Sequence, residues 1–408
     1  MKRAFLLASF LCAAMLGACN RPAPKPAEAR ADLGARGVLM LCQAQFVTDA
    51  SGHPTPGPAR MELVRATNGT WDRVVLEDTL SNVFHKAMVS ISAGDTSVYT
   101  IGGDNAALTC WDAGRVPSRP RRLWQPSFGG KHNRVRDVER GDVDGDGEQE
   151  LVMATHDQGV VAVADLVQGT WQITEVDSAP STFVHEIEIG DVDRDGRLEF
   201  YATPSKPNKA SGASQPGAVV QYSWDGQKYA RAVVDSFLDT HAKEILVADL
   251  DGNGDELYVV KEAVTTAGGA EPEVPVTIVR YQRSKESWQK DVVSTIPDRQ
   301  CRFLLASDLD GDGKKELVAA SFKSGLWWVV PGGTLPWRRE LIDAASSGFE
   351  HACVAADMDA DGVQELYVAS DDQKELRKYL RTPGGFARTT LLPLHGDVIT
   401  WGLTASRM

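Results

Sequence analysis

The sequence predicts an all-β fold assembled from repeated units of four strands. The first observation is an acidic loop, Asp-x-Asp-x-Asp/Asn-Gly, which recurs five times at intervals of 49 to 59 residues and runs each time into a short apolar strand. Its copies begin at Asp142, Asp191, Asp249, Asp308 and Asp357. Repeats of this length are typical of solenoids and propellers, in which each unit buries its apolar face against its neighbours.

Two further periodic signals extend the count to seven units. An aromatic residue precedes a short alternating strand at Trp71, Trp124, Trp171, Tyr229, Trp288, Trp337 and Phe386. A strand also precedes each acidic loop or its equivalent, near residues 88–92, 138–141, 187–190, 245–248, 303–306, 353–356 and 398–403. Four-stranded units of this length indicate a seven-bladed β-propeller, with the aromatic residues as core packing between neighbouring sheets.

The two ends of the chain are expected to share one blade. Residues 38–47, 61–66 and 70–76 read as three strands with no inner strand before them, whereas residues 397–404 form a lone strand at the C-terminus. Joining these segments completes the ring and leaves no exposed sheet edge at the seam.

The acidic loops have the composition of a calcium site. In the first copy, Asp142, Asp144 and Asp146 occupy positions one, three and five, Gly147 permits a sharp turn, and Glu150 stands at position nine. A hard cation takes six to eight oxygen ligands, which alternate carboxylates in a tight loop can supply. An EF-hand would need a twelve-residue loop between helices, and strand sequence follows here instead.

We therefore expect about five structural Ca²⁺ sites. The predicted ligands are Asp142, Asp144, Asp146 and Glu150; Asp191, Asp193, Asp195 and Glu199; Asp249, Asp251, Asn253 and Glu256; Asp308, Asp310, Asp312 and Glu316; and Asp357, Asp359, Asp361 and Glu365. The third loop is one residue shorter and has Asn253 at position five, so its closing ligand is left open. The alternative is a set of acidic turns that bind no metal.

The repeat carries a family resemblance. Residues 141–152, Gly-Asp-Val-Asp-Gly-Asp-Gly-Glu-Gln-Glu-Leu-Val, resemble the FG-GAP and VCBS repeats of integrin-alpha-like seven-bladed propellers. The resemblance covers residues 37–408 and implies calcium binding by the loop residues. Such propellers serve as adhesion modules, carbohydrate binders or, in some families, lyases and dehydratases, so the resemblance does not choose among these functions.

The N-terminus indicates export. Lys2 and Arg3 precede an apolar run over residues 4–16, and the sequence Leu16-Gly17-Ala18-Cys19 resembles the lipobox of bacterial lipoproteins. This resemblance implies a signal peptide over residues 1–18 and lipidation of Cys19. Residues 19–36 would be a flexible tether and 37–408 the propeller. The expected location is the bacterial cell envelope, on the outer membrane; an ordinary secretory signal with a chance Cys is the alternative.

Net charge and cysteine content limit the classes of partner that the protein can have. The formal net charge of −13 argues against nucleic acid, and the acidic loops account for much of that charge. We expect a monomer attached to the membrane through its lipid. Cys42, Cys110, Cys301 and Cys353 remain in the exported domain, and both disulfides and buried free thiols stay open for them.

Histidine and basic residues recur at one place in the repeat. Arg136, His185, Lys243, Arg302 and His351 stand six positions before the first Asp of each loop. In a propeller these strand starts ring one mouth of the central funnel. The predicted ligand-binding residues are His85, Arg136, His185, Lys243, Arg302 and His351, and the catalytic candidates are His185, His241, His351 and His395. The simpler interpretation is that strand starts at a wet channel mouth are polar only to avoid burial.

These patterns favour a calcium-stabilised binding or adhesion module for a glycan or a protein, without catalysis. The alternative is a polysaccharide lyase or sugar dehydratase, a carbon–oxygen lyase that uses the histidine-rich funnel as base. A structural subunit of an envelope complex is a third possibility and would need an exposed apolar rim.

Overall fold

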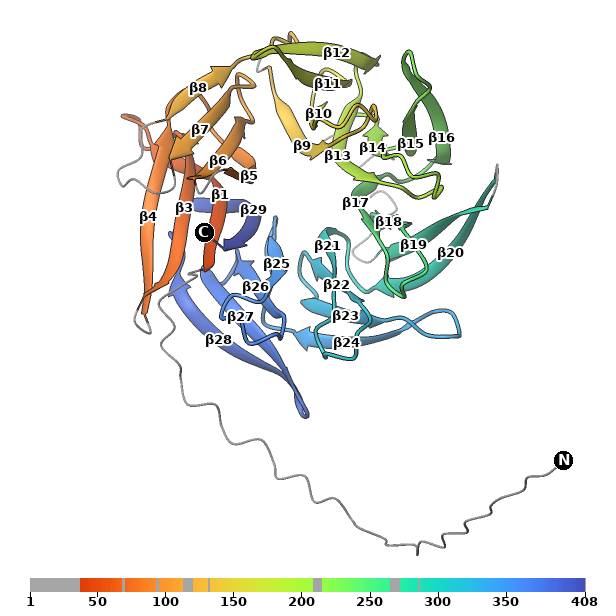
Figure 1. The fold of residues 1–408 in the computed structure, drawn as a ribbon. Coiled ribbons are helices and arrows are strands. Elements are labelled where there is room, and N and C mark those ends of the chain that lie inside the picture. The colour runs from red at the N-terminus through yellow and green to blue at the C-terminus, as the bar shows by residue number, and fades with distance from the viewer. Residues whose placement is uncertain are drawn as a thin grey trace, which may run out of the picture. The chain divides into compact units, whose positions relative to one another are not determined.

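The computed structural model describes residues 37–407, apart from 68–69, 93–94, 113–119, 131–132, 208–214, 265–271 and 285–286. The described residues form strands arranged as seven sheets around a central axis, which confirms the predicted seven-bladed β-propeller (Figure 1). Within these residues there is no helix of the length and apolarity needed to cross a membrane. The predicted signal peptide, Cys19 and the tether lie outside the described residues.

Six blades consist of four consecutive antiparallel strands. The first three are β5 (Phe84–Ser92), β6 (Asp95–Gly102), β7 (Leu108–Asp112) and β8 (Arg121–Trp124); β9 (Val135–Gly141), β10 (Glu150–Thr155), β11 (Val160–Val167) and β12 (Thr170–Ser178); and β13 (Phe183–Gly190), β14 (Glu199–Ser205), β15 (Gly217–Trp224) and β16 (Tyr229–Phe237). The next three are β17 (Ala242–Ala248), β18 (Glu256–Lys261), β19 (Val276–Ser284) and β20 (Ser287–Ile296); β21 (Cys301–Ser307), β22 (Glu316–Ser321), β23 (Leu326–Val330) and β24 (Arg338–Asp343); and β25 (Cys353–Ala356), β26 (Glu365–Ser370), β27 (Glu375–Thr382) and β28 (Gly385–Pro393).

The seventh blade joins the two ends of the described chain, as predicted. The C-terminal strand β29 (Val398–Arg407) pairs antiparallel with β1 (Gly37–Thr48), and β3 (Ala59–Thr67) and β4 (Thr70–Asp78) complete the sheet (Figure 1). A short strand, β2 (Pro54–Pro56), also pairs with the end of β1, in a Pro- and Gly-rich segment that carries no strand signal.

Aromatic pairs link neighbouring blades. The ring of Trp288 on β20 lies 6.3 Å from that of Tyr201 on β14, and Trp337 lies 6.2 Å from Tyr258 in the blade before it. These contacts confirm the expectation that the periodic aromatic residues are core packing. The hydroxyl of Tyr201 donates to Glu199 at the end of an acidic loop (3.2 Å), so the loop and the inter-blade core are joined.

Six of the inner strands, all except β25, have a β-bulge at one level of the propeller. In β17, Ala242 pairs with Lys261 and Glu244 with Val260, so Lys243 is an extra residue. The same irregularity occurs at Trp401 in β29, His85–Lys86 in β5, Arg136 in β9, His185–Glu186 in β13 and Arg302 in β21. A bulge re-aims a side chain that regular alternation would place elsewhere, and bulges are common beside functional sites.

The four cysteines are buried free thiols. Cys42, Cys110, Cys301 and Cys353 are each enclosed in the core and none forms a disulfide. Of the two alternatives left open by the sequence, the structure shows free thiols, which pack as small apolar side chains.

Candidate functional site

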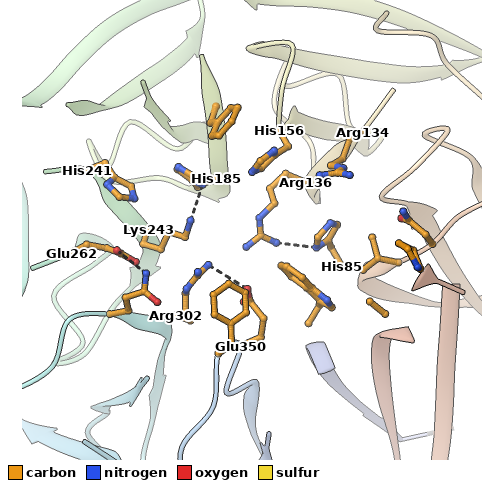
Figure 2. A pocket seen from close by; sticks show the side chains of 18 of the residues that line it. His85, Arg134, Arg136, His156, His185, His241, Lys243, Glu262, Arg302 and Glu350 are labelled. Carbon is orange, nitrogen blue, oxygen red and sulfur yellow. Dashed lines mark hydrogen bonds and ion pairs between the residues drawn. The ribbon is translucent and has the colours of Figure 1, made fainter. Parts of the chain in front are cut away.

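The inner strands begin around a cavity of about 370 Å³ at one mouth of the central channel (Figure 2). Its charged and imidazole side chains are Arg134, Arg136, Lys243, Arg302, His85, His156, His185, His241, Glu262 and Glu350. Aromatic side chains of Phe46, Phe183, Phe349 and Trp401 also line it. Cations outnumber carboxylates, which gives the cavity an excess of positive charge.

Two arginines are held in fixed positions at the centre of this cavity. Arg136 donates to Glu186 and to His85 Nδ1, both at 3.0 Å, and its guanidinium lies 5.3 Å from the ring centre of Trp401. Arg302 lies 3.3 Å from Glu350, which is almost completely buried. Glutamate on one side and an aromatic face on the other restrict each guanidinium, so little side-chain entropy remains to be lost on binding.

The guanidinium of Arg302 also lies over an aromatic ring, 4.4 Å from the ring centre of Phe349. Figure 2 shows Arg136, Lys243 and Arg302 pointing toward one another across the cavity, from strands of three different blades. Their convergence is a property of the ring, because these residues are far apart in the sequence.

Lys243 has a different environment from the arginines. Its Nζ lies 3.2 Å from His185 Nδ1, and His185 Nε2 lies 2.9 Å from Ser205 Oγ. Burial, with Arg302 nearby, lowers the pKa of Lys243 to about 7. A substantial fraction of this amine is therefore uncharged at neutral pH.

The histidines of the cavity are neutral at physiological pH. Burial lowers the pKa of His156 to about 4 and that of His241 to about 3, with cationic neighbours adding to the effect. The pKa values of His85 and His185 lie well below the usual range for the same reasons. These rings therefore act as hydrogen-bond donors and acceptors and add no charge to the cavity.

A smaller cavity of about 110 Å³ lies next to the first and is acidic. Its lining includes Asp137, Glu186, Glu188 and Glu244, with Lys86 as a counter-charge. Burial raises the pKa of Glu186 to about 8 and that of Glu188 to about 7. The channel is thus cationic at the mouth and acidic at the adjoining level.

Five of the predicted ligand-binding residues line the mouth cavity, and so does His241. His351 does not, because its ring contacts the carbonyl of Ser321 and the hydroxyl of Ser346 (both 2.8 Å). Its neighbour Glu350 faces the cavity instead. His395 is exposed in the turn between β28 and β29 and is also absent from the lining.

Several cavity residues were not predicted from the sequence. They include Arg134, His156, Phe183, Glu262, Gln300, Phe349 and Trp401, whereas Glu350 lies at the channel mouth as the sequence predicted. A usable signal existed for two of them, because His156 and Glu262 both directly follow a second strand of a blade, β10 and β18. Trp401 is the extra bulge residue of β29 and therefore the true counterpart of Arg136 and Lys243.

The acidic loops gather carboxylates as a cation site requires. In the second and fourth loops all four predicted carboxylates bring oxygens within 4.8 Å of one another, as do the three aspartates of the first loop and Asp357, Asp359 and Glu365 of the fifth. Backbone amides hold the loop shape; the amides of Asp195 and Gly196, for example, both donate to Asp191 (3.0 Å). These clusters could hold metal ions, and their oxygen-only donors suit calcium.

The glutamate at the end of each loop also favours a bound cation. Glu199 is buried, and burial with Asp193 nearby raises its pKa to about 8. A buried carboxylate beside other carboxylates is unfavourable unless a cation compensates it.

The third loop is the exception. It is not among the clusters of three or more acidic residues found in the described part of the chain. Glu256 lies 3.8 Å from Arg280 and accepts from the hydroxyl of Tyr258 (2.5 Å). This glutamate stands one position earlier in its loop than the closing glutamates of the other four loops, and it already has partners. The third loop is therefore the poorest cation site of the five.

Comparisons with known proteins agree on the repeat and the fold. The family described as FG-GAP-like repeat matches residues 142–202 and 308–368. A comparison with curated proteins found no significant match. Among solved structures, a proposed 6-phosphogluconolactonase from Bacteroides uniformis is similar, with a TM-score of 0.56 and 14% identity over 91% of this chain and 99% of that one.

A second such protein, from Bacteroides fragilis, has a TM-score of 0.53 and 12% identity over 94% of this chain and 100% of that one. At these identities the similarity shows the fold alone. The repeat matches and the closed ring of seven sheets identify the chain as a seven-bladed β-propeller that contains FG-GAP-like repeats at residues 142–202 and 308–368.

Proposed function

We propose that the chain is a binding protein whose mouth cavity takes a small anionic, polyhydroxylated ligand, such as the acidic sugar unit of a glycan. The observation that carries this proposal is the convergence of Arg136, Lys243 and Arg302 on one cavity (Figure 2). A cavity of about 370 Å³ lies within the range of small-molecule sites.

The two guanidiniums suit a carboxylate. Arginine offers several donors in a planar fork that matches the two oxygens of a carboxylate. Arg136 and Arg302 are already oriented by Glu186 and Glu350, so a ligand need not order them. The faces of Trp401 and Phe349 and the neutral histidines offer apolar surface and hydrogen bonds, as a sugar ring requires.

The acidic loops and the N-terminus complete the proposal. The four loops with clustered carboxylates hold structural Ca²⁺, and the third loop binds it weakly. Residues 1–18 are a signal peptide, Cys19 carries the lipid, and residues 19–36 are a tether that displays the monomeric propeller from the outer membrane of a bacterial envelope. The sequence Leu16-Gly17-Ala18-Cys19 is the support for this anchor.

A matched ligand pair tests the binding proposal. The methyl glycoside of glucuronic acid and that of glucose differ only in a carboxylate against a hydroxymethyl group. Calorimetry should show binding of the acid alone, and Arg302→Ala should weaken it roughly ten- to hundredfold, as expected for loss of a charge-assisted hydrogen bond. Arg338→Ala, an exposed substitution on β24, is the control and should bind normally. Equal affinity for both glycosides would contradict the proposal.

Binding of the acid should weaken as pH rises. Lys243, with a pKa of about 7, is charged below that pH and neutral above it, whereas the carboxylate stays charged throughout. Affinity is therefore expected to fall severalfold between about pH 6 and pH 8. Titrations in Lys243→Met should show a smaller dependence, because the cavity histidines remain neutral over the same range and only Glu186 and Glu188 of the adjoining cavity still titrate. A pH profile unchanged by the substitution would exclude Lys243 as the titrating group.

A lyase or dehydratase is the second candidate. The observation that favours it is the contact between Lys243 and His185, which places an amine of near-neutral pKa in the cavity as a base for proton abstraction next to a carboxylate. Formation of an unsaturated, ultraviolet-absorbing product from acidic oligosaccharides would establish it, and intact oligosaccharides after prolonged incubation would exclude it for those substrates.

A further inference from the structure

Lys243 differs from the cavity arginines in its partner. Arg136 and Arg302 each lie beside a glutamate, whereas among the described residues no carboxylate lies within ion-pair distance of Lys243. Its Nζ hydrogen-bonds His185 Nδ1 at 3.2 Å instead. Burial and the neighbouring Arg302 make this amine less stable as an ammonium ion, and Glu262 and Glu350, which act in the opposite direction, offset the effect only in part.

The hydrogen bonds around His185 define its tautomer. Ser205 Oγ donates to the carbonyl of Lys206 (3.2 Å) and receives a hydrogen bond from Gln215 Nε2 (2.9 Å), so it acts as acceptor toward His185 Nε2–H. The lone pair of His185 therefore lies on Nδ1, which faces Lys243. This arrangement gives the amine a neighbouring proton acceptor that is fixed by three hydrogen bonds.

The nearby arginines also disfavour the charged form of Lys243, whereas Glu262 favours it. Arg302 lies close enough to Lys243 to disfavour its protonated form, and the pKa of Lys243 is lowered to about 7 by burial and by that neighbour. A lysine that is desolvated next to another cation is an activated nucleophile toward carbonyl groups. Arg136 and Arg302 point toward the same centre (Figure 2), and each guanidinium has N–H groups beyond those that contact its glutamate, which can hold a carboxylate on the same molecule.

We propose that Lys243 forms a reversible imine with a ligand that carries both a carboxylate and a carbonyl group, such as a 2-oxo acid. This inference rests on the proposed function, because the arginines hold the ligand's carboxylate. The neutral Nζ attacks the carbonyl carbon and forms a C–N bond. One amine proton passes by way of His185 to the oxygen and gives a carbinolamine; the second amine proton follows the same route to the departing hydroxyl, water leaves, and the C=N bond forms with no net oxidation or reduction.

Borohydride trapping of the full chain with pyruvate tests the proposal. Hydride reduction converts an imine to a stable secondary amine, which peptide mass spectrometry locates. We expect the adduct on Lys243 at least tenfold above the exposed Lys290 and Lys323, and none there in Lys243→Arg. Lys86 is an internal control in the same channel, because Glu139 and Asp137 pair with it and its pKa is raised. Labelling spread evenly over the lysines, or absent from Lys243, would overturn the proposal.

A second experiment with lactate as competitor distinguishes an error in the imine proposal from an error in the proposed function. Lactate has the carboxylate of pyruvate and a hydroxyl in place of its carbonyl, so it can bind the arginines without forming an imine. Protection of Lys243 by lactate supports both proposals. If lactate and the glucuronide bind but pyruvate leaves no adduct, the imine is wrong and anion binding stands. If neither anion binds and Lys243 is unlabelled, both proposals fail.

Discussion

Removal of calcium is expected to lower the melting temperature of the propeller by on the order of 10 °C. A ligand that binds only the native state stabilises it by about 2.7 kcal/mol at a hundredfold excess over its dissociation constant. Four loops gather three or more carboxylates, so several such contributions are lost together when a chelator removes the ion. The chelated protein also retains the repulsion among these carboxylates.

The measurement is a thermal melt in calcium and in chelator, with one charge-removing variant in each of two loops. Asp312→Asn keeps an acceptor for the amide of Lys314 but removes one negative charge from the fourth loop. Its melting temperature should fall below the wild-type value in calcium and equal or exceed it in chelator. Asp251→Asn, in the third loop, should have a smaller calcium-dependent effect. A wild-type melt that is unchanged by chelator would show that the loops are not calcium sites.

Deletion of β29 is expected to abolish cooperative folding. The strand pairs residues 37–45 of β1 with residues 398–407, and without it β1 would have an exposed edge in the middle of the ring. Val398 and Leu403 are buried, and the loss of each removes about 1.5–3 kcal/mol of apolar burial. Their contacts are long-range, so no local structure can replace them.

A chain that ends at Asp397 should therefore lack a sharp thermal transition and the near-ultraviolet circular dichroism of packed aromatic side chains. Deletion of Met408 alone is the control and should leave both intact. Co-expression of residues 398–407 as a separate peptide should restore the transition, because the strand has no covalent role beyond its position in the sheet. A cooperative melt of the truncated chain at the wild-type temperature would contradict this closure.

The features of this protein that its sequence predicts correctly are local or periodic. The five acidic loops, the recurring aromatic residues and the out-of-phase ends each repeat a pattern, and a seven-bladed ring is the arrangement that satisfies all three. The structure confirms the ring and its closure by β29, and it places Arg136, His185, Lys243 and Arg302 at one cavity. Because these four residues occupy equivalent positions in equivalent blades, their convergence follows from the symmetry of the fold.

Only the tertiary structure decided which side chain of each blade faces the cavity. In a strand, a shift of one residue turns a side chain to the opposite face, and a bulge changes the register by one residue without a clear sequence signal. Strand β25 begins only at Cys353, and its described pairing contains no such bulge. In this blade Glu350 therefore faces the cavity, and His351 is buried in the core. The bulge in β29 presents Trp401, not His395. The sequence by itself thus determined the number of blades, their closure and the acidic loops, whereas the chemistry of the cavity depends on single-residue register, which is set by pairing between distant strands.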